Sequence, residues 1–158
     1  MYWNRYDSEK DVIVKAKEKK SYKLMDKINL YEQQSEIDHK VLKENSQGAY
    51  SKEHKRFYRF AEQNGYFSYE LEVKKANQYF LEIEELIFDE EPMDFIISID
   101  EIVLFRASMR IEKDEFIKKY KMELHPDWLK DKGTITITVK GNGANETGKI
   151  SSIFINWI

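Results

Sequence analysis

The sequence predicts an α+β fold, in which N-terminal amphipathic helices precede an antiparallel meander sheet of about six or seven strands. Between 8 and 42, apolar side chains recur mostly at helical spacings of three and four residues. From 57 onward, short apolar or alternating runs are separated by turn residues. The chain has 158 residues, which suits one domain with its own core. We therefore expect a single domain, 1–158, with a helical region at 1–48 and a sheet region at 49–158.

The helical region has a plausible start and end. Asp7-Ser8 offers an N-cap, and Gln47-Gly48 is typical of the residues that end a helix. The apolar positions at helical spacing are Ile13, Ala16, Leu24, Ile28 and Tyr31. Lysines between them alternate with acidic residues, which favours a solvated helix face over a phosphate or lipid site.

Asn64-Gly65 is the sharpest local signal in the chain, because this pair is preferred in two-residue hairpin turns. A turn there would pair Tyr58 with Leu71 and Phe60 with Tyr69. The alternative is a helix over 51–63 that is capped by Gly65. Both interpretations stay open, and we favour the hairpin.

The remaining strands follow from apolar runs and alternation. They are expected at 79–84, with a bulge at Glu85, and at 95–99, 102–105, 116–124, 134–139 and 150–158. Asp100-Glu101 separates the second and third of these, as a turn or a kink. Residues 112–120 could instead form a short helix. Thr134 to Val139 is the clearest strand, because threonines alternate with Ile and Val.

Composition and motifs argue against several chemistries. The chain has no cysteine, which excludes disulfides and zinc–thiolate sites. Its three histidines, His39, His54 and His125, lack metal-ligand spacing, and no nucleophile elbow or phosphate-binding loop is present. No apolar run is long enough to cross a membrane. We therefore expect a protein without catalytic residues, metal or cofactor, and not an enzyme.

Charge is concentrated in one segment. Residues 61–101 carry two basic and twelve acidic side chains, in a chain whose net charge is −3. Such a segment repels nucleic acid and attracts a basic protein surface. The residues that we expect to contact a partner are Glu82, Glu84, Glu85, Asp89, Glu90, Glu91 and Asp94.

The C-terminal part of the chain resembles the TipC-type immunity proteins that neutralise LXG toxins of the type VIIb secretion system. The resemblance lies in Ile99-Asp100-Glu101-Ile102, His125-Pro126-Asp127-Trp128-Leu129, Gly133-Thr134-Ile135-Thr136-Ile137 and residues 150–157. It implies a non-catalytic protein that binds a cognate secreted toxin directly. It also implies a location on the extracytoplasmic face of the membrane, the alternative being cytoplasmic.

An anchor would lie upstream of Tyr2, because the aromatic residues beside Arg5 are typical of the flank of a membrane span. Two other functions stay open. One is a small enzyme with a carboxylate-based site, and the other is a ligand-binding sheet protein.

Overall fold

The computed structural model describes residues 22–88, 93–108, 116–143 and 145–158. In these residues the chain is almost entirely β-structure, in one curled, antiparallel, nine-stranded sheet. The strands are β1 (Lys23–Asn29), β2 (Leu42–Ser51), β3 (Arg56–Glu72), β4 (Tyr79–Leu86), β5 (Asp94–Ile99), β6 (Ile102–Ser108), β7 (Ile117–Leu124), β8 (Thr134–Gly141) and β9 (Lys149–Trp157). Two short helices are α2 (Gln33–Asp38) and α3 (Pro126–Leu129).

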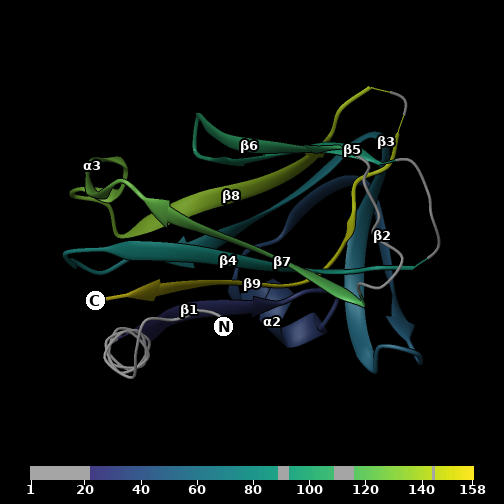
Figure 1. The fold of residues 1–158 in the computed structure, drawn as a ribbon, viewed down its shortest axis with the longest axis horizontal. Helices are drawn as coiled ribbons and strands as arrows, with labels where there is room; N and C mark the ends of the chain where they lie inside the picture. Colours follow the sequence, from purple (N-terminus) through teal and green to yellow (C-terminus); the bar gives the residue numbers. More distant parts are fainter. Residues whose placement is uncertain (1–21, 89–92, 109–115, 144) are drawn as a thin grey trace, which may run out of the picture.

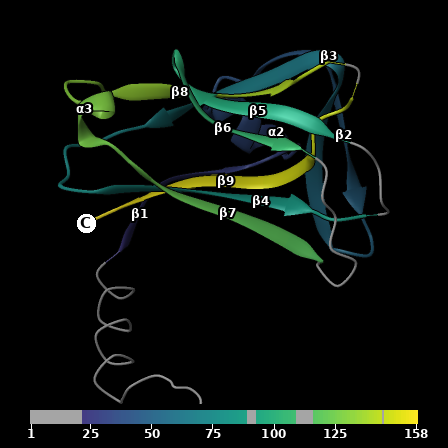
Figure 2. The ribbon, with the colours of Figure 1, turned by 45° about the horizontal axis from the view of Figure 1, so that its top comes forward.

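The sheet folds back on itself into two layers (Figures 1 and 2). The strand order is β6-β5-β8-β3-β9-β4-β7, with β1 added to β9 and β2 added to β3. One layer therefore holds β6, β5 and β8, and the other holds β1, β9, β4 and β7. β3 belongs to both, because its second half pairs with β8 while Arg59 in its first half pairs with Ile150 of β9.

The core lies between the layers and follows from alternation along each strand. Ile135, Ile137 and Val139 of β8 are fully buried, whereas the threonines between them are exposed or half-buried. The facing layer contributes Leu81 and Ile83 of β4, together with Ile28, Ile153 and Ile155. The sheet does not close through backbone pairing, because β6 and β7 lie at the two ends of the strand order. These two strands instead contact each other through the stacked rings of Phe105 and Tyr120, with centroids 5.2 Å apart.

The predicted α+β class is wrong for the residues that the structure describes. The region expected to be helical contains β1, the six-residue α2 and most of β2. Residues 8–21 of the predicted helices lie outside the described residues. The prediction of a helix from residue spacing fails here because Ile28 and Leu30, both fully buried, follow the two-residue period of a strand. The sheet is also no meander, since β3, β8 and β9 pair with strands distant in sequence.

The predicted hairpin turn at Asn64-Gly65 is also wrong, because β3 runs unbroken from Arg56 to Glu72. The alternative helix over 51–63 is wrong too, because this segment holds the end of β2, a turn and the start of β3. Asn64 does adopt the left-handed conformation, with φ of 60°. The register of β2 against β3 slips at the same level, between Glu44 and Ser46. The Asn-Gly pair therefore lies at an irregularity in a long strand rather than at a reversal of the chain.

The later strands are confirmed. Strands β4, β5 and β6 lie where strands were expected at 79–84, 95–99 and 102–105. Strands β7, β8 and β9 likewise match the expected strands at 116–124, 134–139 and 150–158. The turn at Asp100-Glu101 and the bulge at Glu85 are confirmed as well, since β4 shifts register against β9 between Glu84 and Glu85. The helix expected as an alternative over 112–120 is absent from its described part, where β7 begins at Ile117.

Candidate ligand-binding site

A pocket of about 330 Å³ opens beside β9 where the β2–β3 hairpin and α2 approach it. Figure 1 shows both elements toward the end of β9 that lies away from the C-terminus. The pocket is lined by Lys27, Asn29, Leu30, Glu32, Tyr50, Lys55, Arg56, Phe57, Glu84, Ser151 and Ser152. These residues come from five segments of the chain, so the fold assembles a site that no local sequence motif encodes.

Aromatic side chains form the rim of this pocket. Tyr50 and Phe57 meet edge to face, with ring centroids 4.9 Å apart, and Tyr31 continues the row 6.3 Å from Phe57. They are between 41% and 50% exposed, which is unusual for three large aromatic residues in one place. The rim therefore offers apolar ring faces to a ligand.

The floor of the pocket is polar and paired. Arg56 donates from Nη1 to Glu84 Oε1 over 2.7 Å, and the Ser152 hydroxyl donates to the same oxygen over 2.8 Å. Lys119 Nζ lies 3.8 Å from the other carboxylate oxygen. This floor presents charged donors and a carboxylate acceptor close to the aromatic rim.

Glu84 is held in its ionised form. Burial raises the pKa of its carboxyl, but hydrogen bonds from Ser152 and Arg56 outweigh burial, with help from the charges of Arg56 and Lys119. The net pKa of Glu84 lies below the ordinary value. A carboxylate of this kind accepts hydrogen bonds well but is a poor proton donor near neutral pH.

Tyr31 is held in place by its backbone and by its ring. Its backbone is in the left-handed conformation, with φ of 62°, and its N–H donates to Glu36 Oε2 over 3.0 Å. The ring packs against Gly48, where a Cβ would overlap it. The guanidinium of Arg59 lies 5.4 Å from the ring centroid. Strained backbone that is over-determined in this way is frequent at binding sites.

A buried network supports Tyr31 from below. Arg59 donates from Nε and Nη2 to the two oxygens of Glu36, both over 2.7 Å, and the Tyr69 hydroxyl donates to Glu36 over 2.5 Å. Burial raises the pKa of Glu36, yet the hydrogen bonds from Arg59, Tyr69 and the Tyr31 N–H bring it below the ordinary value. Burial and the adjacent Glu36 charge raise the pKa of Tyr69. The three side chains therefore form a fully partnered polar group beneath the rim.

A histidine fixes the hairpin that carries Tyr50, Arg56 and Phe57. His54 is buried in the hairpin turn, with Nδ1 2.7 Å from the Ser51 hydroxyl and Nε2 2.8 Å from the carbonyl oxygen of Ile87. Its ring stacks on Phe116, with centroids 4.2 Å apart. The turn is thereby tied to the end of β4 rather than standing free in solvent.

The predicted acidic surface does not form one patch in the described residues. Glu82 and Glu84 share the outward face of β4, where Lys121 and Arg56 pair with them. Glu85 is 2% exposed and accepts a hydrogen bond from the Tyr120 hydroxyl. Asp94 lies in the other layer and pairs with Arg106. Asp89, Glu90 and Glu91 lie outside the described residues. Glu84 is thus the one predicted residue that lines the pocket.

Sequence reasoning missed the aromatic rim. The excess of aromatic residues was the available signal, but it does not say which rings stay exposed. The sequence predicts a helix at Tyr31, and it predicts Phe57 in a hairpin that turns at Asn64-Gly65. In the structure Tyr31 lies between β1 and α2, and Phe57 lies at the start of the continuous strand β3. The rim depends on the curl of the sheet, which no local spacing predicts.

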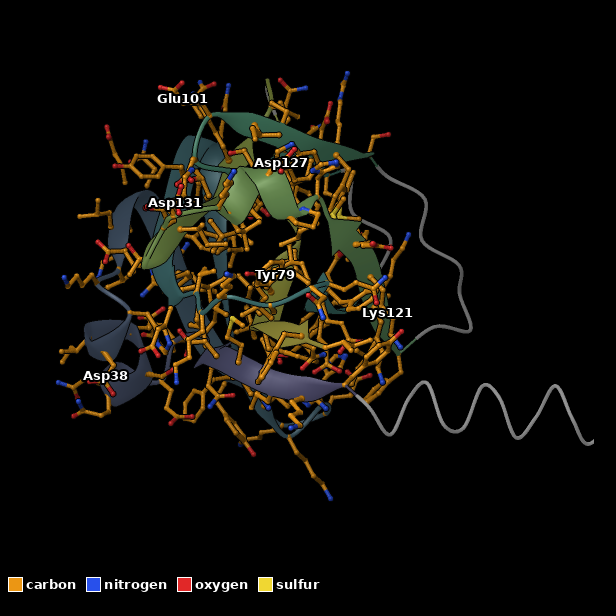
Figure 3. All side chains as sticks on the ribbon, turned by 90° about the vertical axis from the view of Figure 1, so that its left-hand side faces the viewer. Asp38, Tyr79, Glu101, Lys121, Asp127 and Asp131 are labelled. Atoms are coloured by element: carbon orange, nitrogen blue, oxygen red, sulfur yellow. The ribbon has the colours of Figure 1, made fainter. Side chains whose placement is uncertain are left out.

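A second hollow lies at the end of the sandwich that carries α3, which Figure 3 views directly. It measures about 370 Å³ and is lined by Lys74, Lys75, Ala76, Tyr79, Pro126, Asp127, Leu129, Lys130, Asp131 and Lys132. Tyr79 lies near the middle of this end, and its hydroxyl donates to the carbonyl oxygen of Lys74. Lysines and aspartates alternate here without an aromatic rim, so this hollow is the weaker candidate.

In the described part of the chain, no group of three or more His, Asp or Glu side chains could hold a metal ion. The histidines are separate: His39 contacts Asp26, His54 lies in the hairpin turn, and His125 accepts from the Asp127 N–H. None of the described helices is long and apolar enough to cross a membrane.

Solved structures with this fold include carbohydrate-binding modules and a glycosidase that matches over part of its length. A family 35 module from Clostridium thermocellum is 11% identical, with 73% of this chain and 90% of that chain covered and a TM-score of 0.52. A module from lichenase 5A of Cellvibrio mixtus, in complex with cellotriose, is 10% identical, with coverages of 86% and 99% and a TM-score of 0.56. These likenesses define the chain as a β-sandwich of the type found in such modules.

An exo-β-1,3-galactanase from Phanerochaete chrysosporium is 8% identical, with a TM-score of 0.58. The match covers 84% of this chain but only 29% of that one. A search of the curated proteins found no match. The chain belongs to a family of unknown function, DUF6805, whose model matches residues 21–155.

Proposed function

We propose that this protein is a non-catalytic binding module and that its ligand is a carbohydrate held in the pocket between Tyr50, Phe57 and Glu84. The observation that carries the proposal is the exposed aromatic rim above a paired, ionised floor. Sugars present an apolar face of C–H groups and a periphery of hydroxyls. Aromatic ring faces accommodate the apolar face of the sugar, and charged donors and acceptors bind its hydroxyl groups.

The fold supports the proposal by analogy. Structures that share the two-layered sheet include modules whose names record carbohydrate binding, one of them in complex with cellotriose. At 8–13% identity they support a shared architecture, whereas the ligand depends on the side chains that line the pocket. The pocket volume of about 330 Å³ is at the small end of the range for organic ligands.

Binding without catalysis is favoured by the state of Glu84. Glycoside hydrolysis needs one carboxyl with a raised pKa to protonate the leaving group. The pKa of Glu84 is lowered by Ser152 and Arg56, and both groups keep the carboxylate engaged. Such a group suits hydrogen bonding to hydroxyls.

The test is a glycan array followed by calorimetry with cellotriose and β-1,3-galactotriose as defined probes. We expect the wild-type chain to bind at least one array glycan. Phe57→Ala should lower the affinity about tenfold or more, because one aromatic face is lost. The midpoint of thermal unfolding should hardly change, since Phe57 is 43% exposed. Phe105→Ala, in the opposite layer, is the matched control and should bind as the wild type does. Absence of binding across the array, or full affinity in Phe57→Ala, would refute the proposal.

The toxin-binding function implied by the resemblance to TipC-type proteins stays a prediction, as does the extracytoplasmic location. It depends on the acidic stretch rather than on the aromatic rim. Reversal of Asp89, Glu90 and Glu91 to lysine should weaken capture of a cognate LXG toxin and its dependence on salt. Substitution of Phe57 would leave that capture intact, so the two functions are separable.

A further inference from the structure

The outward face of β9 continues beyond the pocket as an ordered series of side chains. Ile153 and Ile155 are fully buried, so Phe154 between them points to the outer face. On β4, Phe80 lies between the buried Tyr79 and Leu81 and points the same way. Both rings are half-buried rather than covered. The outer face of this layer thus carries aromatic groups outside the pocket.

The register of the three strands arranges these side chains in rungs across β1, β9 and β4. The first rung is Asn29, Ser152 and Glu84; the second is Lys27, Phe154 and Glu82; the third is Leu24, Asn156 and Phe80. All of the first rung lines the pocket. Successive rungs are two residues apart on β9, so the three rungs extend over about 14 Å.

The second rung is joined to the pocket by Lys27. This side chain lines the pocket, and its Nζ lies 5.7 Å from the centroid of the Phe154 ring. On the other side of Phe154, Glu82 pairs with Lys121 over 3.1 Å. The second rung therefore repeats the composition of the pocket, with an aromatic ring beside a base–carboxylate pair.

The third rung ends the series with a paired aromatic platform. The ring of Tyr22 lies 4.6 Å from that of Phe80, at an angle of 40°. Asn156 adds an amide with donors and an acceptor on the neighbouring strand. Half-buried rings and polar groups thus alternate from the pocket to Tyr22.

We infer that the ligand is an extended oligosaccharide chain that runs along β9, with one end in the pocket and the following units over Phe154 and then Phe80 and Tyr22. The inference rests on the proposed function and adds the length and direction of the ligand. A single sugar would fill the pocket and leave the other two rungs unused. A peptide strand cannot add here by backbone pairing, because β9 is already paired with β1 and β4 on its two sides.

The test compares affinities for mono- and trisaccharides of the cello- and β-1,3-galacto- series, or of the linkage that the array identifies. In the wild type, the trisaccharide, whose units reach from the pocket past Phe154, should bind about tenfold more tightly than the monosaccharide, which corresponds to one added stacking contact. Phe154→Ala should remove that gain and leave monosaccharide affinity within about twofold of the wild type, because Phe154 does not line the pocket. Phe154→Leu keeps an apolar side chain without a ring and serves if the alanine variant unfolds.

Controls separate this inference from the proposed function. Phe105→Ala should keep the gain from mono- to trisaccharide, and the trisaccharide should shift the amide NMR signals of Phe154 and Phe80 where the monosaccharide does not. Equal affinity for short and long chains in the wild type, or a gain that persists in both Phe154 variants, would overturn the extended site alone. If no glycan binds at all, the proposed function fails and the extended site with it.

Discussion

The guanidinium of Arg59 lies beneath the ring of Tyr31, 5.4 Å from its centroid, and thereby connects the exposed rim to the buried core. The Arg59 side chain is 3% exposed, and its guanidinium donates two hydrogen bonds to Glu36, which in turn accepts from the Tyr31 N–H. One carboxylate thus fixes both the backbone of Tyr31 and the cation under its ring. Rim and core should respond together to changes in this group.

Glu36→Gln should destabilise the protein by about 3 kcal/mol, because it leaves Arg59 buried without its counter-charge. The measurement is urea unfolding at neutral pH. Glu70→Gln is the matched control, since Glu70 forms an exposed pair with Lys40 over 3.6 Å. It should cost no more than about 0.5 kcal/mol. Equal losses in the two variants would contradict the role assigned to Glu36.

Stability should fall as the pH drops below the ordinary carboxyl pKa of 4.5. The folded-state pKa values of Glu36 and Glu84 are both lowered, so the unfolded chain binds more protons in this range. The stability that these two carboxylates contribute is complete above pH 4.5 and is lost as the pH falls through their folded-state pKa values. Thermal unfolding between pH 7 and pH 3 should show this decline, and Glu36→Gln should show a shallower one. An unchanged slope in the variant would contradict the pKa assignment.

Gly48→Ala should displace Tyr31 and weaken ligand binding. A Cβ at this position would overlap the Tyr31 ring and the backbone carbonyl oxygen of Tyr58, and the backbone cannot move aside cheaply. We expect a loss of about 1–3 kcal/mol in stability. Gly133→Ala is the control, because a Cβ there meets nothing within 4 Å. Thermal unfolding and glycan affinity, measured on both variants, test the prediction; normal binding by Gly48→Ala would contradict it.

His54→Ala should loosen the hairpin that carries Tyr50 and Phe57. The change removes the hydrogen bond to the Ile87 carbonyl oxygen and the stacking on Phe116, which should cost about 2–3 kcal/mol. Amide exchange in 50–57 should accelerate more than in β8. His125→Ala is the control, since His125 is exposed and lies in the α3 segment. Equal acceleration in the two segments would indicate a general loss of stability instead.

The sheet was predictable where a strand alternates cleanly. Ile135, Ile137 and Val139 are buried as a period of two requires, and Asp100 turns the chain between β5 and β6 with φ of 52°. Prediction failed where two periods fit the same residues. Leu24, Ile28 and Tyr31 fit a helical spacing, yet pairing with β9 made 23–29 a strand. Propensity is a weak prior that tertiary contacts override.

Asn64-Gly65 shows that a correct local signal can have a different use. The left-handed backbone at Asn64 is present, but Gly65 is buried against Asn45 of β2, where a Cβ would not fit. A turn signal specifies dihedral angles and not the path of the chain beyond them. For the same reason the pocket could not be predicted. Tyr50, Glu84 and Ser152 meet only because distant strands pair.

Since β3 is shared by both layers, neither half of the molecule is an independent folding unit. The segment that bears Arg56 and Phe57 is covalently continuous with the one that bears Phe67 and Leu71, both fully buried. A force or denaturant that peels one layer from the other must break that single strand's ladder. We therefore expect the recognition surface and the hydrophobic interior to unfold together in one transition. The recognition surface should be rigid because the interior that supports it is rigid.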